Sequence, residues 1–249
     1  MNQDLPLVLL HGWGMTTRIW NGLRICLSPR IALTPALPGH DEPQQSGQTS
    51  PGASLQDWSE AVLAKLPPRC VLAGWSLGAM LALDLAARHP ERIQQLVLFG
   101  TTPRFVAGPD WPHGLDAPTV AAFSSGFATD PEATLRRFMA LQLLGESRRR
   151  GVMHSLGNAL LLCDEGNTPA LADGLHILAQ ADLRASVANI EQPVSLIHGR
   201  DDALMPLAAA QWLAQALPDA RLTVLDGCGH VPFVSQAEEC ARLLEAAFA

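Results

Sequence analysis

The chain has 249 residues, 48% of them hydrophobic and 16% charged, with a formal net charge of −7. This length suits one α/β domain with a modest insertion, and the apolar content is sufficient for a large core, which excludes a disordered protein. The negative charge argues against nucleic-acid binding, and no apolar run reaches the roughly 20 residues of a membrane span, so we expect neither kind of partner.

The amino-terminal part of the chain alternates between strand and helix patterns. Residues 5–10 form a continuous apolar run, which is typical of a parallel strand buried on both faces. Ser54 is a candidate N-cap for a helix that Pro67 and Pro68 end. In order, we predict a strand over residues 5–10, a helix from residue 17, a strand over 30–37, an exposed loop over 41–53 and a helix over 55–66.

The most informative stretch is a short connection between a predicted strand and a predicted helix. An apolar run at 70–73 predicts the strand, and a helix-forming run follows at 79–87. Between them lies Gly74-x-Ser76-x-Gly78, which leaves no room for an ordinary loop. Such a tight turn forces the serine into a strained backbone conformation, and the glycines avoid clashes with neighbouring elements. The pattern predicts a nucleophile elbow, with the Ser76 hydroxyl at the N-terminus of a helix.

The remainder of the chain interrupts this alternation and then resumes it. We predict a strand over residues 95–99 and then four helices, over 116–126, 131–144, 147–163 and 168–180. Strands follow over 194–198 and 221–225, and a last helix begins at about residue 237. Strand–helix alternation predicts an α/β fold, a mostly parallel sheet of about six strands with helices on both faces. We expect a core of residues 1–108 and 186–249, and an inserted helical lid of residues 109–185 above the carboxyl edge, where ligands bind in such sheets.

A serine hydroxyl needs a base before it acts as a nucleophile at neutral pH. His230 lies on the glycine-rich loop after the last predicted strand, in Gly-Cys-Gly-His-Val-Pro-Phe. The acid that orients it should follow the fifth strand, where Asp201 and Asp202 are neighbours. We prefer Asp202, because its spacing to Pro206, which opens the next helix, leaves Asp201 as a solvated loop residue. The predicted catalytic triad is therefore Ser76, Asp202 and His230.

The backbone N–H groups of Trp13 and Leu77 are the predicted oxyanion hole. Trp13 directly follows the first strand, and the glycines on either side of it allow its N–H to point at a ligand. Leu77 follows the nucleophile at the start of the helix. The Trp13 side chain is either ordinary core or a wall of the pocket, and its position favours the pocket.

These motifs resemble the α/β-hydrolase superfamily along essentially the whole chain. Four motifs narrow this resemblance, namely His11-Gly12-Trp13-Gly14, Gly74-Trp75-Ser76-Leu77-Gly78, the lid string Arg137-Phe138-Met139-Ala140-Leu141-Gln142, and Asp182-Leu183-Arg184. By these motifs the chain is similar to the biotin-pathway carboxylesterases that hydrolyse pimeloyl-[acyl-carrier protein] methyl ester. The resemblance implies the α/β-hydrolase fold and a serine esterase that uses neither cofactor nor metal.

The resemblance also implies two larger sets of residues. The substrate site would be lined by Trp13, Ser76, Leu77, Phe138, Met139, Ala140, Leu141, Gln142 and His230. A docking face for the acidic acyl carrier protein would be formed by lid arginines, Arg137 and Arg150 matching best, with Arg136 and Arg149 beside them. Solvated helix faces are the alternative explanation of these arginines.

Some alternatives stay open at this point. The same triad would serve a general short-chain carboxylesterase or a carbon–carbon bond hydrolase. A third possible function is that of a ligand-binding module with slow turnover. The chain also departs from the family pattern in three places. The hairpin before the first strand is missing or vestigial, the loop after His40 lacks the usual glycine, and His154 stands where another arginine is expected.

The cysteines and the first residues indicate the compartment. The five cysteines are widely spaced without a C-x-x-C motif, namely Cys26, Cys70, Cys163, Cys228 and Cys240. This odd, scattered set favours reduced thiols and argues against a disulfide framework or a zinc site. Residues 1–4 carry no basic side chain ahead of the apolar run, so we expect no signal peptide and a cytoplasmic, monomeric protein.

Overall fold

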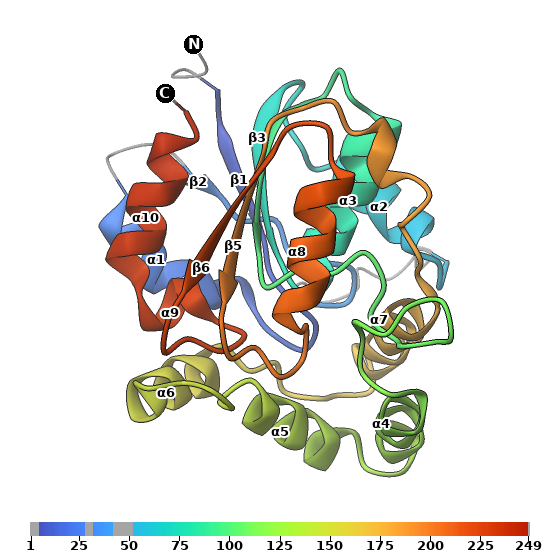
Figure 1. Ribbon diagram of the computed structural model, residues 1–249. Coiled ribbons are helices and arrows are strands. Elements are labelled where there is room, and N and C mark those ends of the chain that lie inside the picture. The colour runs from blue at the N-terminus through green and yellow to red at the C-terminus, as the bar shows by residue number, and fades with distance from the viewer. Residues whose placement is uncertain (1–4, 28–31, 42–51, 249) are drawn as a thin grey trace.

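The computed structural model describes residues 5–27, 32–41 and 52–248, and its centre is a six-stranded sheet (Figure 1). The strands are β1 (Leu7–Leu10), β2 (Ala32–Leu33), β3 (Cys70–Trp75), β4 (Ile93–Phe99), β5 (Val194–Gly199) and β6 (Ala220–Leu225). Their order is β2-β1-β3-β4-β5-β6, and every neighbouring pair is parallel. Because parallel strands all run the same way, their carboxyl ends meet at one edge of the sheet.

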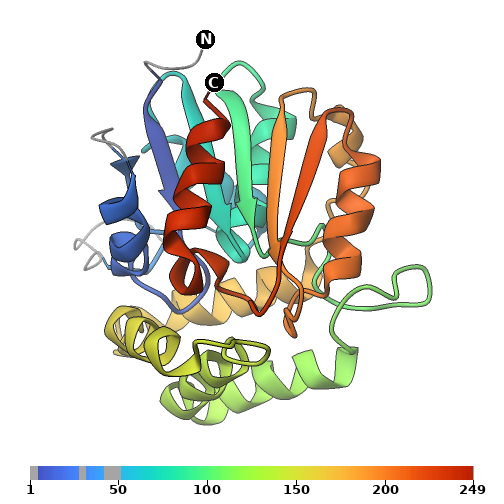
Figure 2. The same cartoon turned by 60° about the vertical axis from the view of Figure 1, so that its left-hand side comes forward.

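Helices cover both faces of this sheet, because each strand presents apolar side chains alternately to its two sides. In β1, Leu7 and Leu9 join one buried cluster, whereas Val8 and Leu10 join the other. On the first face lie the 3₁₀ helix η1 (Thr17–Trp20), α1 (Asn21–Cys26), α9 (Pro232–Ser235) and α10 (Ala237–Ala246) (Figure 2). On the second face lie α2 (Leu55–Leu63), α3 (Leu77–Arg88) and α8 (Leu207–Ala216) (Figure 1).

Four helices stand between β4 and β5 in the chain and form a layer across the carboxyl edge of the sheet (Figure 2). They are α4 (Ala117–Thr129), α5 (Pro131–Leu141), α6 (Arg149–Ala159) and α7 (Thr168–Gln180). The side chains of Asp116 and Asp130 cap α4 and α5, each accepting a 2.9 Å hydrogen bond from a first-turn N–H. We call this layer the lid; its limits at residues 109 and 185 stay a prediction.

An ion-pair cluster joins the two ends of the lid. Arg184 contacts Asp110 near the point where the chain leaves the core and Asp182 where it returns, at 2.7 Å in both cases. Arg104 also pairs with Asp110, at 3.1 Å. The guanidinium of Arg184 lies 5.6 Å from the ring of the buried Trp111. These charge pairs therefore join the two ends of the inserted segment to each other and, through Arg104, to the core.

Some predicted elements differ in extent from the observed ones. The strand expected over 30–37 is observed only as β2, and its first two residues, like most of the loop expected over 41–53, lie outside the described ranges. Pro35 has no N–H with which to continue the ladder, and the Leu37 N–H is donated to His11 instead, at 3.1 Å. Ser54 caps α2 as predicted, in a capping box with Asp57.

The part of the chain that the structure describes contains no helix with both the length and the apolar character needed to cross a lipid bilayer.

Candidate active site

Ser76 lies on the turn between β3 and α3. Its backbone has φ 57° and ψ −120°, a conformation that residues other than glycine rarely adopt. The turn depends on two glycines. A Cβ on Gly74 would lie 2.5 Å from the carbonyl oxygen of Gly78, and a Cβ on Gly78 would lie 2.5 Å from that of His11. Leu77 is the first residue of α3, and first-turn N–H groups have no partner within a helix. The turn thus presents a serine hydroxyl beside N–H groups that favour negative charge.

His230 and Asp202 form a buried pair. Nδ1 of His230 lies 2.8 Å from a carboxylate oxygen of Asp202, and both side chains are almost fully shielded from solvent. The other oxygen accepts hydrogen bonds from the N–H groups of Leu204 and Met205, both at 2.9 Å. Burial alone raises the pKa of Asp202, but the charge of His230 and its hydrogen bond outweigh burial, so that the pKa lies below its usual range. Asp202 is therefore a carboxylate with fixed orientation.

The neighbouring candidate acid, Asp201, is exposed, and its N–H donates to the carbonyl oxygen of Cys228 at 3.0 Å. A second histidine, His198, is buried in β5 with Nε2 3.4 Å from the Asp202 carboxylate and 2.7 Å from the carbonyl oxygen of Met205. Burial lowers the pKa of His198, which keeps the ring neutral. Of the two sequence-predicted acids, Asp202 is thus the one that the structure places at His230.

The loop of His230 is also bound to Trp75, the residue before Ser76. The indole Nε1 of Trp75 donates a 2.8 Å hydrogen bond to the carbonyl oxygen of His230, and the two rings lie 5.5 Å apart. Nε2 of His230 is buried and has no hydrogen-bond partner among the described residues. This nitrogen is the one a general base would use, since Nδ1 already faces Asp202.

Two buried histidines support the loop that carries Trp13. Nε2 of His11 accepts from the Leu37 N–H, and Nε2 of His40 accepts from the Gly14 N–H, both at 3.1 Å. Burial lowers the pKa of His11 to about 4 and that of His40 to about 3. Both rings are therefore neutral, with the proton on Nδ1. The supporting role of His40 was not predicted from the sequence.

The Trp13 side chain joins this loop to the lid. Its indole Nε1 donates to the carbonyl oxygen of Leu171 on α7 at 2.8 Å, and its ring meets Phe138 edge-on at 5.0 Å and Phe127 at 5.7 Å. A Cβ on Gly174 of α7 would lie 2.6 Å from the indole, so the close approach of α7 requires glycine. Trp13 is thus buried between the core and the lid, where it contacts the side chains of Phe127 and Phe138 and the backbone of α7.

The lid string 138–142 lies at the carboxyl end of α5. Phe138 is buried against Trp13, and Gln142 is fully buried with both amide atoms lacking a hydrogen-bond partner within the described residues. Leu141 is half-buried on the same helix face, because positions three and four apart lie together. Met139 packs toward the other buried cluster, and Ala140 is exposed.

The four predicted docking arginines are all exposed on the lid. Arg136 pairs with Glu132 one turn earlier on α5, at 2.5 Å, and Arg137 lies 5.2 Å from the ring of Phe123. Arg149 and Arg150 begin α6, which lies beside α5 in both views (Figure 1, Figure 2). The exposed charges of these two helices are therefore mostly positive on a protein whose net charge is −7.

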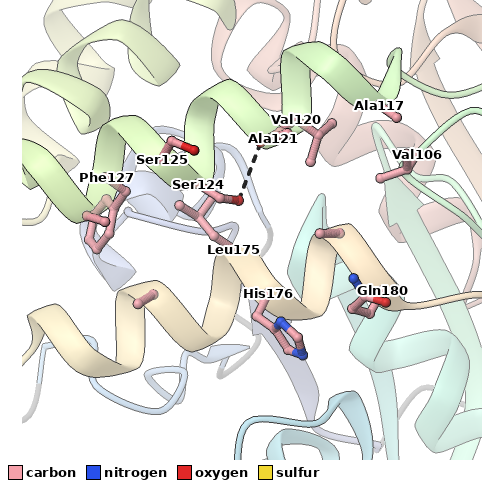
Figure 3. Close-up of a pocket in the computed structure, with 13 residues that line it drawn as sticks. Val106, Ala117, Val120, Ala121, Ser124, Ser125, Phe127, Leu175, His176 and Gln180 are labelled. Carbon is pink, nitrogen blue, oxygen red and sulfur yellow. Dashed lines mark hydrogen bonds between the residues drawn. The ribbon is translucent and has the colours of Figure 1, made fainter.

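A cavity of about 570 Å³ lies between α4 and α7 (Figure 3). Val120, Phe127 and Leu175 line it together with the polar side chains of His176 and Gln180. No residue of the predicted triad lines this cavity. One of its lining residues, Phe127, also contacts the ring of Trp13, at 5.7 Å.

Residues 7–243 match the model of the Alpha/beta hydrolase family. The pimeloyl-[acyl-carrier protein] methyl ester esterase of Aromatoleum aromaticum is 51% identical over 96% of each chain. The esterase of the same name from Nitrosomonas europaea is 40% identical over 96% of this chain and 94% of its own.

Solved structures with much lower identity share the fold. An esterase from Exiguobacterium antarcticum superposes with a TM-score of 0.81 at 19% identity, covering 100% of this chain and 93% of its own. An enol-lactonase from Burkholderia xenovorans superposes with a TM-score of 0.79 at 21% identity, covering 98% of this chain and 91% of its own.

Proposed function

The chain belongs to the Alpha/beta hydrolase family, and from that premise we propose that it is a serine carboxylesterase that hydrolyses the methyl ester of pimeloyl-acyl carrier protein. Its product would be the free pimeloyl carboxylate used in biotin synthesis. The observation that carries the chemistry is the strained Ser76 turn together with the buried Asp202–His230 pair. The substrate is taken from relatives of that name that match nearly the full chain.

The proposed reaction uses only side chains, backbone N–H groups and water. The Ser76 hydroxyl attacks the ester carbonyl while Nε2 of His230 takes its proton, and Asp202 stabilises the imidazolium that forms. The N–H groups of Trp13 and Leu77 stabilise the negative charge on the carbonyl oxygen. His230 then returns the proton to the leaving methoxide, and methanol departs. Water hydrolyses the acyl-enzyme by the same proton transfers in reverse.

The acyl chain would lie between the core and the lid. Phe138 and the Trp13 ring supply an apolar wall, and the unpartnered amide of Gln142 supplies a polar group among buried side chains. A buried amide without a partner costs stability, and a polar group of the substrate would remove that cost. Met139, Ala140 and Leu141 complete the proposed lining of the site.

Acyl carrier protein is the proposed carrier of this ester, and the exposed arginines of α5 and α6 are its proposed docking face. Arg137 and Arg150 are the central pair, with Arg136 and Arg149 beside them. An acidic partner would be steered to this face by charge, and that attraction weakens with salt.

The proposed function is tested by kcat/KM on methyl pimeloyl-acyl carrier protein and on the same ester carried by a small thiol, at low and high salt. We expect a preference for the carrier-bound ester that shrinks as salt is raised. Equal rates on the two esters would overturn the docking face and favour a general carboxylesterase. Hydrolysis of p-nitrophenyl esters without hydrolysis of either pimeloyl ester would overturn the substrate.

A further inference from the structure

The turn between α5 and α6 is in direct contact with the loop that carries His230. The N–H and the hydroxyl of Ser147 both donate to the carbonyl oxygen of Gly227, at 3.0 and 2.8 Å. The guanidinium of Arg148 donates to the carbonyl oxygen of Ser235 at 3.1 Å. This part of the lid therefore bonds to the chain on both sides of His230, at Gly227 and at the end of α9.

Glu146 occupies the middle of this contact. A carboxyl oxygen of Glu146 accepts a 2.9 Å hydrogen bond from the N–H of Gly229, the residue directly before His230. Only 8% of the Glu146 surface is exposed, although glutamate is rarely buried without a specific partner. Burial raises the pKa of Glu146, while the N–H groups of Gly229 and Val231 and the Ser235 hydroxyl oppose that change.

The close approach of lid and loop also depends on glycine. A Cβ on Gly229 would lie 2.3 Å from the carbonyl oxygen of Leu144, and a Cβ on Gly145 would lie 2.3 Å from that of Asp201. Gly145 also has a φ of 77°, a backbone conformation that glycine adopts without strain. The lid backbone thus contacts the loops of both His230 and its acid.

We propose that Glu146 is a positioning residue for His230, which fixes the backbone before the histidine by accepting the Gly229 hydrogen bond. Asp202 faces Nδ1 of His230, Trp75 binds its carbonyl oxygen, and Glu146 binds the N–H of Gly229, one residue earlier in the chain. Small displacements of a general base lower the rate of proton transfer steeply. The inference rests on the proposed esterase chemistry, though not on the identity of the ester.

The test compares Glu146→Ala with Glu146→Gln on a p-nitrophenyl ester. Glu146→Ala removes the acceptor, and we expect kcat to fall roughly 10-fold to 100-fold with little change in KM, because the misplaced base acts on the chemical step. Glu146→Gln keeps a carbonyl oxygen that can accept the same bond, and we expect kcat to stay within about threefold of the parent. Thermal unfolding of each variant confirms that the protein is folded at the assay temperature.

Glu165→Ala is the matched control, because Glu165 is an exposed carboxylate on another part of the lid. It should change neither kcat nor KM. If Glu146→Ala unfolds at a lower temperature yet keeps the parent kcat, Glu146 only stabilises the fold and the proposal is wrong. An equal decrease of kcat in Glu146→Ala and Glu146→Gln would also overturn the proposal. If Glu146→Ala fails to fold, Glu146→Met, which fills the space without an acceptor, takes its place. An inactive parent enzyme would instead refute the esterase function itself.

Discussion

At the scale of single residues, the site depends on the protonation of buried side chains. Nδ1 of His230 lies 2.8 Å from one oxygen of the Asp202 carboxylate, and the other oxygen accepts hydrogen bonds from two backbone N–H groups. His198 lies on the other side of the same carboxylate, at 3.4 Å, and burial keeps it neutral. One aspartate therefore contacts two histidines, and the second of them, His198, also contacts the carbonyl oxygen of Met205.

The two adjacent aspartates give the sharpest test of this arrangement. Asp202→Asn should lower kcat roughly 10³-fold to 10⁴-fold, because an amide cannot stabilise the imidazolium or hold the correct tautomer. Asp201→Asn is the matched control, one residue away and exposed, and should leave kcat close to that of the parent. Steady-state kinetics on a p-nitrophenyl ester distinguishes the two variants. A larger loss in Asp201→Asn would show that Asp202 is not the catalytic acid.

Sequence patterns predicted the residues whose roles depend on close neighbours in the chain. The Ser76 turn is encoded within five residues by Gly74 and Gly78, and the clash distances explain why both must be glycine. Glu146 could not be found in this way, because its partner Gly229 lies 83 residues further on and either residue alone is unremarkable. The pairing of His40 with Gly14 across 26 residues was hidden for the same reason.

At the scale of elements, the lid helices combine an apolar face with a charged one. On α5, Phe138 is directed at Trp13, while Arg136 and Arg137 are exposed. On α6, Val152 and Leu156 are buried in the cluster that includes β1 side chains, while Arg149 and Arg150 are exposed. This division fits the proposed function, in which the buried face lines the acyl site and the exposed face meets the carrier protein.

Charge reversal on these helices tests the second role. In the double variant Arg137→Glu, Arg150→Glu, the ratio of kcat/KM for the carrier-bound ester to that for the small-thiol ester should fall roughly 10-fold or more at low salt. Arg242→Glu, on α10 and paired with Glu239, is the control and should leave the ratio unchanged. If the double variant keeps the parent ratio of kcat/KM values, these arginines do not bind the carrier protein and are ordinary solvated surface charges.

Element types were easier to predict than element ends. Four α-helices and no named strand lie between β4 and β5 in the described part of the chain, as the sequence pattern predicted, and the observed α7 (Thr168–Gln180) has the predicted bounds. The strand predicted over residues 30–37 extends too far toward its carboxyl end, because β2 ends at Leu33. Pro35 has no N–H for strand pairing, and the N–H of Leu37 donates to His11 instead. The short helix α9 after His230 was not predicted, because four residues carry no periodic signal.

At the scale of the whole molecule, buried neutral histidines link folding to pH. In the unfolded chain His11 and His40 titrate near pH 6.5, whereas in the folded protein their pKa values are about 4 and about 3. Between these limits the unfolded state binds more protons, so the free energy of unfolding must decrease as the pH falls. The loss approaches about 1.4 kcal/mol per pH unit for each histidine.

Urea unfolding at pH 7.5, 6 and 5 measures this dependence. The midpoint should fall steadily below about pH 6.5. His40→Gln should make the decline shallower, whereas His176→Asn, at an exposed position, should leave its slope unchanged. A midpoint that is constant from pH 7.5 to pH 5 would contradict the neutral state assigned to both buried rings.

The contact between the lid turn and the His230 loop has a consequence for protein engineering. Replacing the lid with that of another hydrolase is an obvious way to alter substrate range, since the insertion leaves all six strands intact. Such a graft would also remove Glu146 and Ser147, and with them the bonds to Gly229 and Gly227. A chimera that keeps residues 143–148 of this chain would preserve those bonds, whereas one cut at the lid base would carry an intact triad with a loosely held base.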